Sequence, residues 1–275
     1  MRTSSRLVAL LVAVGLMAGW AHVVAAGESP RVSPVLDRIL AKKELVVGTA
    51  ASMPPLNMTT KDGQIIGLDI DLARMFANGM EVKLTLKPMH FNELLPALEA
   101  GQVDMIISGM TITPVRNLKV AFVGPYFASG KSILTKEANI SSMDEASKMN
   151  NPDTVLVALK GSTSQMFVER LLPKAKLVTA EDYEQAVGMV RDGKAKAMVA
   201  DYPICMVTVY RYPDGGFATL KKPISYEPVG VALPANDPLL VNWVENSLNT
   251  IMASGEMDAS MKRWFNDPSW VKQLR

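Results

Sequence analysis

Short apolar runs alternate with segments of helical periodicity along most of the chain, and this alternation constrains the fold more than any other sequence feature. Apolar runs bounded by turn residues predict strands, and apolar residues at three- and four-residue spacing predict helices. Their alternation favours an α/β fold with mainly parallel sheets. In the helix predicted at 67–78, Asp69 and Asp71 fall outside the apolar face. We predict strands at 45–49, 82–86, 103–107, 154–159, 176–178 and 197–200, and helices at 67–78, 91–100, 162–172, 181–191, 240–252 and 256–265.

The pattern restarts in the middle of the chain, which predicts two lobes. Residues 95–108 resemble residues 188–201, because each stretch is a helix, a glycine turn, an apolar strand and then a polar residue. In open α/β sheets, ligands gather at the carboxyl ends of strands. We therefore expect Ser108 and Asp201, which end the two stretches, to face one crevice between opposed lobes.

The first 26 residues have the pattern of a signal peptide. Arg2 and Arg6 precede an unbroken apolar stretch at 7–17, and small residues follow at 25–26. A transmembrane anchor would need about 20 apolar residues, whereas two glycines and a histidine interrupt this segment. We expect cleavage near position 26 and a secreted mature chain. A lipid anchor is not expected, because no cysteine directly follows the apolar stretch.

The mature chain is predicted to be formally neutral and to need no metal or cofactor. The sequence has 29 basic and 27 acidic residues, and two arginines lie in the predicted signal peptide. Balanced charge gives no reason to expect nucleic acid or an anionic membrane surface as a partner. After cleavage the chain keeps one histidine, His90, and one cysteine, Cys205, which disfavours histidine-rich metal sites and catalytic Cys/His pairs. We interpret Cys205 as a structural, partly buried residue.

The segment 108–116 follows a predicted strand and is chemically suited to bind a carboxylate. Gly109 allows the backbone to approach a ligand closely, and Thr111 offers a hydroxyl group. The Thr-Pro pair at 113–114 is typical of a helix cap and first helical position. Arg116 supplies a planar, bidentate guanidinium. An ordinary helix start with a solvated arginine explains the same residues and remains an alternative.

Two further features can each be interpreted either functionally or structurally. Ser162 and Thr163 lie in a Lys-Gly-Ser-Thr-Ser segment at a predicted helix start, where free N–H groups favour an anion. A plain N-cap accounts for them equally well. Asp201 ends a strand and precedes a predicted helix at Tyr202, so its carboxylate is suited both to cap that helix and to accept hydrogen bonds from an ammonium group.

The ordered set of motifs resembles the polar amino-acid branch of bacterial extracellular solute-binding proteins, family 3, which deliver solutes to ABC importers. The resemblance covers nearly all of the mature chain. Each motif is modest evidence by itself, but their order is specific. The motifs are LVVGT at 45–49, PP at 54–55, GLDIDL at 67–72, LLPALEAGQVD at 94–104, GMTITPVR at 109–116, FVGPY at 122–126, KGST at 160–163 and PVGVAL at 228–233.

This resemblance implies a two-lobed periplasmic-binding-protein fold, in which each lobe is a mainly parallel sheet flanked by helices. Two hinge segments, near 129–134 and 225–229, would join the lobes. The implied organisation is a signal peptide at 1–26, a first lobe built from 27–130 and a return segment at 228–275, and a second lobe at 131–227.

The resemblance also implies roles for particular residues. The α-carboxylate of an amino acid would be held by Arg116, Thr111 and the backbone near Ser162 and Thr163. The α-ammonium would be held by Asp201, the Gly109 carbonyl and Ser108. The ligand would lie against the apolar wall of Phe91 and Met53. Both Arg116 and Asp201 are expected to face an open, wet cleft.

The expected ligand has an uncharged side chain. Met53 replaces an aromatic residue that many relatives carry, and Ala50 stands where cation-binding relatives commonly carry an acid. Burying an ammonium without a partner is costly, so arginine and lysine are expected to bind worse than uncharged amino acids.

Two other functions remain alternatives, because a fold does not determine a function. A periplasmic dehydratase for arogenate-like substrates would need a general acid in the cleft. We assign none, because Glu93, Glu169 and Glu227 are predicted to be surface or hinge residues. The chain is alternatively a ligand-sensing component for a receptor. The partners expected from the preferred function are an amino-acid-like ligand and an inner-membrane ABC permease, with the protein a monomer.

Overall fold

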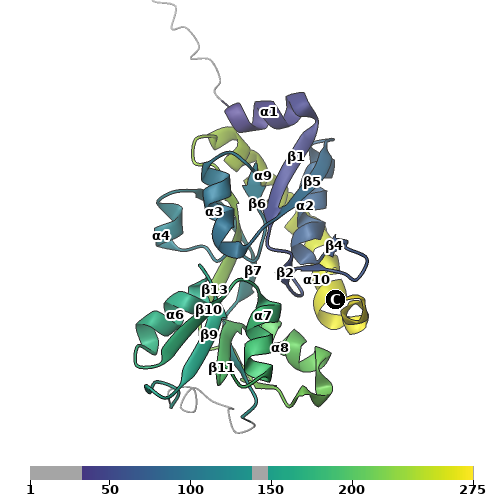
Figure 1. The fold of residues 1–275 in the computed structure, drawn as a ribbon. Helices are drawn as coiled ribbons and strands as arrows, with labels where there is room; N and C mark the ends of the chain where they lie inside the picture. Colours follow the sequence, from purple (N-terminus) through teal and green to yellow (C-terminus); the bar gives the residue numbers. More distant parts are fainter. Residues whose placement is uncertain (1–32, 138–147, 275) are drawn as a thin grey trace, which may run out of the picture. The chain divides into compact units, whose positions relative to one another are not determined.

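The computed structural model describes residues 33–137 and 148–274. The predicted signal peptide at 1–26 lies outside the described residues. Ser33 to Arg275 form one compact unit, which contains two five-stranded sheets and a small three-stranded sheet (Figure 1). We call the parts built on the two large sheets the first lobe and the second lobe.

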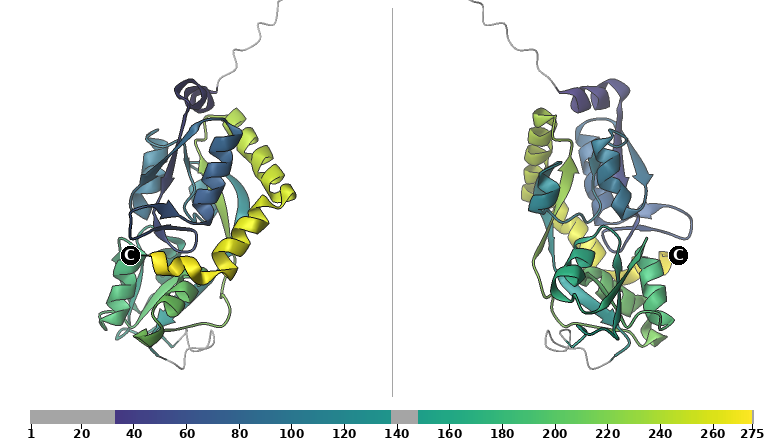
Figure 2. Two further views of the ribbon diagram at one scale, coloured as in Figure 1. Left: turned by 90° about the vertical axis from the view of Figure 1, so that its right-hand side faces the viewer. Right: turned by 60° about the vertical axis from the view of Figure 1, so that its left-hand side comes forward.

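The first lobe is built on a sheet with the strand order β5-β1-β6-β13-β7. Strands β5, β1 and β6 are parallel, and β13 runs antiparallel to both β6 and β7. The C-terminal helices α9 and α10 pack beside α2 (Figure 2). The elements are α1 (Pro34–Lys42), β1 (Glu44–Thr49), α2 (Leu68–Gly79), β5 (Lys83–Pro88), α3 (Phe91–Glu99), β6 (Met105–Ile106), α4 (Pro114–Asn117), β7 (Ala121–Ser129), β13 (Glu227–Leu233), α9 (Pro238–Ser254), α10 (Glu256–Asn266) and the 3₁₀ segment η2 (Pro268–Gln273).

The second lobe is built on a sheet with the order β10-β9-β11-β8-β12. Its strands β10, β9 and β11 are parallel, and β8 runs antiparallel to β11 and β12. The elements are β8 (Lys131–Thr135), β9 (Val155–Leu159), α6 (Thr163–Leu171), β10 (Lys176–Ala180), α7 (Tyr183–Arg191), β11 (Ala197–Asp201), α8 (Tyr202–Arg211), the 3₁₀ turn η1 (Pro213–Gly215) and β12 (Ala218–Thr219). The small sheet of β2 (Ser52–Met53), β3 (Asn57–Thr59) and β4 (Ile65–Ile66) follows β1.

The chain passes between the two large sheets at two adjacent places. The first passage is Gly130, between the end of β7 and the start of β8. The second passage lies before β13, where Ile224 donates its N–H to the Lys131 carbonyl at 2.8 Å. The two passages approach so closely that a Cβ at Gly130 would lie 2.1 Å from the Ser225 carbonyl oxygen. A side chain at this position would therefore push the two segments apart.

The α/β class and the alternation of strands and helices predicted from the sequence are confirmed. Asp69 and Asp71, which fall outside the predicted apolar face of α2, are nevertheless both buried. Asp71 accepts hydrogen bonds from Ser260 Oγ at 2.6 Å and from Trp264 Nε1 at 2.7 Å, and these tie α2 to α10. Sequence periodicity did not reveal α1 or the small sheet. No helix in the described part of the chain is long and apolar enough to cross a bilayer.

Candidate functional site

The loop after β6 is held in place by hydrogen bonds from two sides. Ser108 Oγ accepts the Ala50 N–H at 2.8 Å, and the Gly109 N–H donates to the Asp69 carboxylate. Gly109 has φ +56°, and a Cβ there would lie 2.9 Å from Leu56 Cδ1. The loop therefore needs glycine for its left-handed backbone and for its close approach to Leu56.

Asp69 is a supporting residue whose role sequence analysis missed. Its carboxylate is fully buried and accepts hydrogen bonds from Tyr126 Oη and Asn57 Nδ2, both at 2.7 Å. Burial raises its pKa from 3.8 to about 6, although the three hydrogen bonds from Tyr126, Asn57 and Gly109 act in the opposite direction. The position of Asp69 inside the GLDIDL motif was the available signal, but helical periodicity showed only that it falls outside the apolar face.

Arg116 is buried, which excludes the interpretation as a solvated arginine. Thr113 caps α4 as predicted and accepts the Arg116 N–H at 3.2 Å. The guanidinium donates to the Thr111 carbonyl at 2.8 Å and to the Gly161 carbonyl of the second lobe at 3.1 Å. It also lies 5.6 Å from the centre of the Phe91 ring. Burial lowers its pKa, whereas the negative charges of Asp201 and Glu227 raise it.

The start of α6 brings one of its two predicted site residues to this group. Thr163 Oγ1 lies 3.3 Å from Thr111 Oγ1, a hydrogen bond between the second and first lobes. The Ser162 hydroxyl instead accepts the Gln165 N–H at 3.2 Å and donates to the Leu159 carbonyl at 2.6 Å. Ser162 is therefore used as the N-cap, the alternative that the sequence left open, and its hydroxyl group is occupied.

Asp201 does not cap α8, so the capping interpretation is wrong. Its Oδ1 atom instead lies 2.6 Å from the Nζ atom of Lys131, a fully buried residue. The same Nζ atom lies 3.5 Å from Glu227 Oε2. The expectation that no glutamate lies beside the site residues is therefore wrong for Glu227. Sequence reasoning missed Lys131 because nothing local distinguishes it from a solvated lysine.

Met53 and Phe91 are both buried near the loop at 108–111. Met53 lies under that loop, with its sulfur 4.0 Å from Ser108 Oγ and its methyl group 3.0 Å from where a Gly109 Cβ would be.

The expectation of an open, wet cleft is wrong for the charged pair, since Arg116 is 8% and Asp201 6% exposed. Cys205 is fully rather than partly buried, and burial raises its thiol pKa to about 12.

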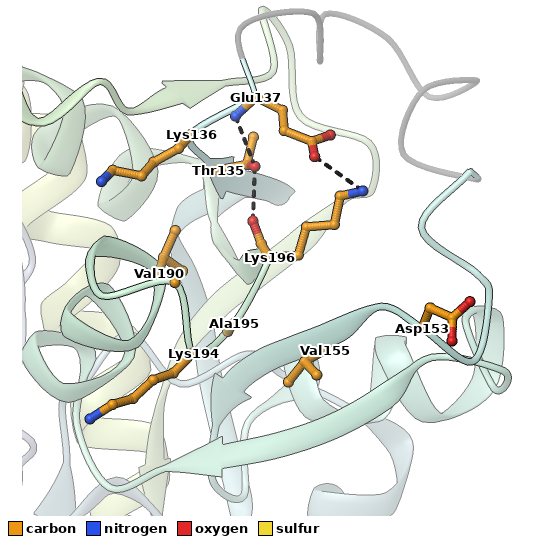
Figure 3. Close-up of a pocket in the computed structure, with 10 residues that line it drawn as sticks. Thr135, Lys136, Glu137, Asp153, Val155, Val190, Lys194, Ala195 and Lys196 are labelled. Atoms are coloured by element: carbon orange, nitrogen blue, oxygen red, sulfur yellow. Dashed lines mark hydrogen bonds and ion pairs between the residues drawn. The ribbon is translucent and has the colours of Figure 1, made fainter.

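A cavity of about 360 Å³ in the second lobe is separate from these residues (Figure 3). Its charged lining is largely paired, because Lys196 Nζ lies 3.1 Å from Glu137 and Lys136 Nζ donates to the Arg191 carbonyl at 3.1 Å. Across residues 33–137 and 148–274, no group of three His, Cys, Asp or Glu side chains is arranged to hold a metal ion. The buried ionic group around Arg116 and Asp201 is therefore the candidate site.

This chain is similar to known proteins in sequence and in structure. The family model described as "Bacterial extracellular solute-binding proteins, family 3" matches residues 45–267. A glutamine-binding protein of an ABC transporter from Bacillus subtilis (strain 168) is 30% identical over 211 residues, covering 74% of each chain. Cyclohexadienyl dehydratase from Pseudomonas aeruginosa is 24% identical, over 83% of this chain and 85% of that protein.

The crystal structure of an ancestral amino acid-binding protein, described as a precursor of cyclohexadienyl dehydratase, has a TM-score of 0.76 and 36% sequence identity. The match covers 84% of this chain and 99% of that one. Further relatives are named as binding proteins for arginine, histidine and cystine. The two-lobed periplasmic-binding-protein fold expected from the motifs is confirmed by these neighbours. The chain therefore belongs to the bacterial extracellular solute-binding proteins of family 3.

Proposed function

We propose that this protein captures a zwitterionic amino acid between its two lobes and delivers it to an ABC importer. One observation carries the proposal: a buried guanidinium and a buried carboxylate, on different lobes, each keep unused hydrogen-bonding capacity. The two groups are Arg116 and Asp201, which are opposite in charge, as are the two ends of an amino acid.

Arg116 has donors to spare for a carboxylate. A guanidinium has five N–H donors, and two of them reach the Thr111 and Gly161 carbonyls. The other three meet no acceptor in the part of the chain that the structure describes. Hydrogen bonds from a guanidinium to a carboxylate are charge-assisted and stronger than neutral ones, so a ligand carboxylate that accepts these donors would bind favourably. Thr111 and Thr163 add two hydroxyl groups beside it.

Asp201 keeps one oxygen for an ammonium group. Its Oδ1 atom is held by Lys131, while no residue within 33–137 or 148–274 donates to Oδ2. We also assign the Gly109 carbonyl and the Ser108 hydroxyl to this ammonium group. Both residues lie in the loop that carries Thr111. Phe91 and Met53 form the apolar side of the site.

The fold supports a hinged mechanism for this capture. We place the first lobe at 27–130 and 228–275 and the second at 131–227, with hinges near 129–134 and 225–229, where the chain passes between the sheets. Rotation about two adjacent passages is the usual closing motion of binding proteins. The mature protein would work as a monomer in the periplasm and present the closed form to an inner-membrane permease.

Calorimetric titration of the mature protein with a panel of amino acids tests this function. Arg116→Ala and Asp201→Asn should each weaken binding of the best ligand about thirtyfold or more, since truncating one partner of a buried charge pair costs about 2–5 kcal/mol and 1.4 kcal/mol is tenfold in Kd. The exposed residues Arg170 and Asp214 provide matched controls, and Arg170→Ala and Asp214→Asn should leave Kd unchanged. If neither site variant alters binding, the site assignment fails.

Loss of binding in only one variant would identify a different ligand class. If Arg116→Ala abolishes binding and Asp201→Asn does not affect it, the solute is a carboxylate without an ammonium group. Solution scattering gives an independent check, because a saturating ligand should reduce the radius of gyration. An unchanged radius would contradict the hinge assignment.

A dehydratase is the second candidate, favoured by the relative from Pseudomonas aeruginosa and by the unexpected position of Glu227. Both oxygens of Glu227 are engaged, however, since Oε2 lies 3.5 Å from Lys131 Nζ and Oε1 accepts the Ser225 hydroxyl at 3.1 Å. A general acid must instead be free to donate a proton to substrate. Incubation with arogenate should give no aromatic product; turnover that disappears in Glu227→Gln would replace binding by catalysis as the function. The third function, a ligand-sensing component for a receptor, would also require the protein to capture the amino acid.

A further inference from the structure

Lys131 is a fully buried cation at the start of β8, next to the proposed ligand site. Its Nζ atom lies 2.6 Å from Asp201 Oδ1 and 3.5 Å from Glu227 Oε2. A buried ammonium is costly unless it is paired, and here it has two carboxylates as partners. Neither the carboxylate nor the ammonium end of an amino acid needs this residue, so its presence requires another explanation.

The formal charges of the four side chains that interact around Arg116 and Lys131 cancel. Arg116 and Lys131 are positive, and Asp201 and Glu227 are negative. An amino acid with an uncharged side chain adds no net charge to this group, whereas a cationic side chain adds an unpaired positive charge. Without Lys131, the same site would carry one excess negative charge, which would suit a cationic ligand.

The position of Lys131 is fixed by the second passage between the sheets. Ser225 Oγ accepts the Lys131 N–H at 2.9 Å and donates to Glu227 Oε1 at 3.1 Å. Glu227 in turn pairs with Ser129 across β13 and β7. Asp201 pairs with Lys131 itself across the antiparallel strands β11 and β8. Both carboxylates are therefore held by the backbone around Lys131, and its ammonium group lies between them.

We propose that Lys131 is a specificity-determining residue: it supplies an internal countercharge to Glu227 and thereby selects against ligands with cationic side chains. The inference rests on the proposed function. Relatives are named for both glutamine and arginine, so membership of the family leaves the charge of the side chain open. In this chain the buried ammonium already balances the negative charge that would otherwise favour a cationic side chain.

The test compares the Kd values of glutamine and arginine in wild type and four variants by calorimetry. Lys131→Met should raise the relative affinity for arginine at least about tenfold, equivalent to about 1.4 kcal/mol. Glu227→Gln leaves an excess positive charge and should shift the ratio in the opposite direction. The double variant Lys131→Met/Glu227→Gln restores neutrality and should return the ratio to within about threefold of the wild-type value. Lys136→Met, at an exposed position, is the matched control.

The outcomes separate this inference from the proposed function. If the wild-type protein binds neither these nor any other amino acid, both are overturned. If it binds but the arginine-to-glutamine ratio is unchanged in Lys131→Met, only the specificity role fails, because a merely structural lysine would weaken both ligands alike. If Lys131→Met does not fold, as judged by circular dichroism, Glu227→Gln and the double variant still test the inference. Glu227→Gln should shift the arginine-to-glutamine ratio, and the double variant should restore it. If the ratio does not move in this way, the specificity role fails.

Discussion

Replacing Asp69 by asparagine should change how the stability of the protein depends on pH. Asp69 lies under the Gly109 loop, and burial raises its pKa from 3.8 to about 6 in the folded state. The folded protein therefore holds this proton more tightly than the unfolded chain does. The resulting stabilisation is fully present below pH 3.8 and is lost as the pH rises through about 6.

The magnitude follows from the two pKa values. Between pH 7 and pH 4.5, the proton on Asp69 should contribute about 2 kcal/mol to the free energy of unfolding, from the linkage of proton binding to folding. The asparagine side chain of the variant cannot titrate, so this contribution disappears. Other carboxylates titrate in the same range, among them Asp104, whose pKa burial also raises. The informative quantity is therefore the difference between wild type and variant at each pH.

Urea unfolding at pH 7 and pH 4.5 measures that difference. The free energy of unfolding of wild type relative to Asp69→Asn should increase by about 2 kcal/mol at the lower pH. Asp214→Asn, at an exposed position, should show no such change. If the free energies of unfolding of wild type and Asp69→Asn differ by the same amount at both pH values, the assignment of a raised pKa to Asp69 is refuted.

Three other perturbations test the buried contacts. Gly130→Ala should lower the free energy of unfolding by at least about 2 kcal/mol in urea, because its Cβ would lie 2.1 Å from a carbonyl oxygen; an unchanged midpoint would contradict the close passage. Cys205, with a thiol pKa of about 12, should react with a thiol reagent at pH 8 only after denaturation, and rapid labelling of the native protein would exclude its burial. Asp201→Asn should lower the stability of the empty protein by about 1–3 kcal/mol, since the buried ammonium of Lys131 then has a neutral acceptor in place of a charged one; equal melting curves would show that this pair is solvated.

Much of the fold follows from local sequence patterns. The alternation of apolar strands and amphipathic helices predicted most elements of both sheets, with ends shifted by a few residues, because these patterns reflect which face of each element is buried. The Thr113-Pro114 pair likewise predicted the short helix that positions Arg116. The elements that were not predicted are α1, the small sheet and the strands β7, β8, β12 and β13 of the two large sheets. The strands of the small sheet and β12 have only two or three residues each, which is too short for a period to be recognised.

The candidate site was predictable only in part. Arg116 and Thr111 were found because their chemistry and their place after a strand are local properties. Asp69 was predicted only to lie outside the apolar face, because helical periodicity does not identify a buried carboxylate whose partners, such as Tyr126, lie far along the chain. Glu227 was predicted to be a surface or hinge residue, because its partner Lys131 is also distant in sequence.

The α/β class, the repeated lobe and the motifs of a solute-binding family were all predictable from local patterns in the chain. Which charged side chains meet, in contrast, depends on how the two sheets assemble. Lys131 and Asp201 are 70 positions apart, and their ion pair depends on β8 lying antiparallel beside β11 in the second sheet. Helix formation and the apolar pattern of a strand are local in sequence, whereas burial and charge pairing depend on residues brought together by the sheets. For that reason the sequence predicted the kind of ligand, and the structure revealed the lysine proposed to restrict its charge.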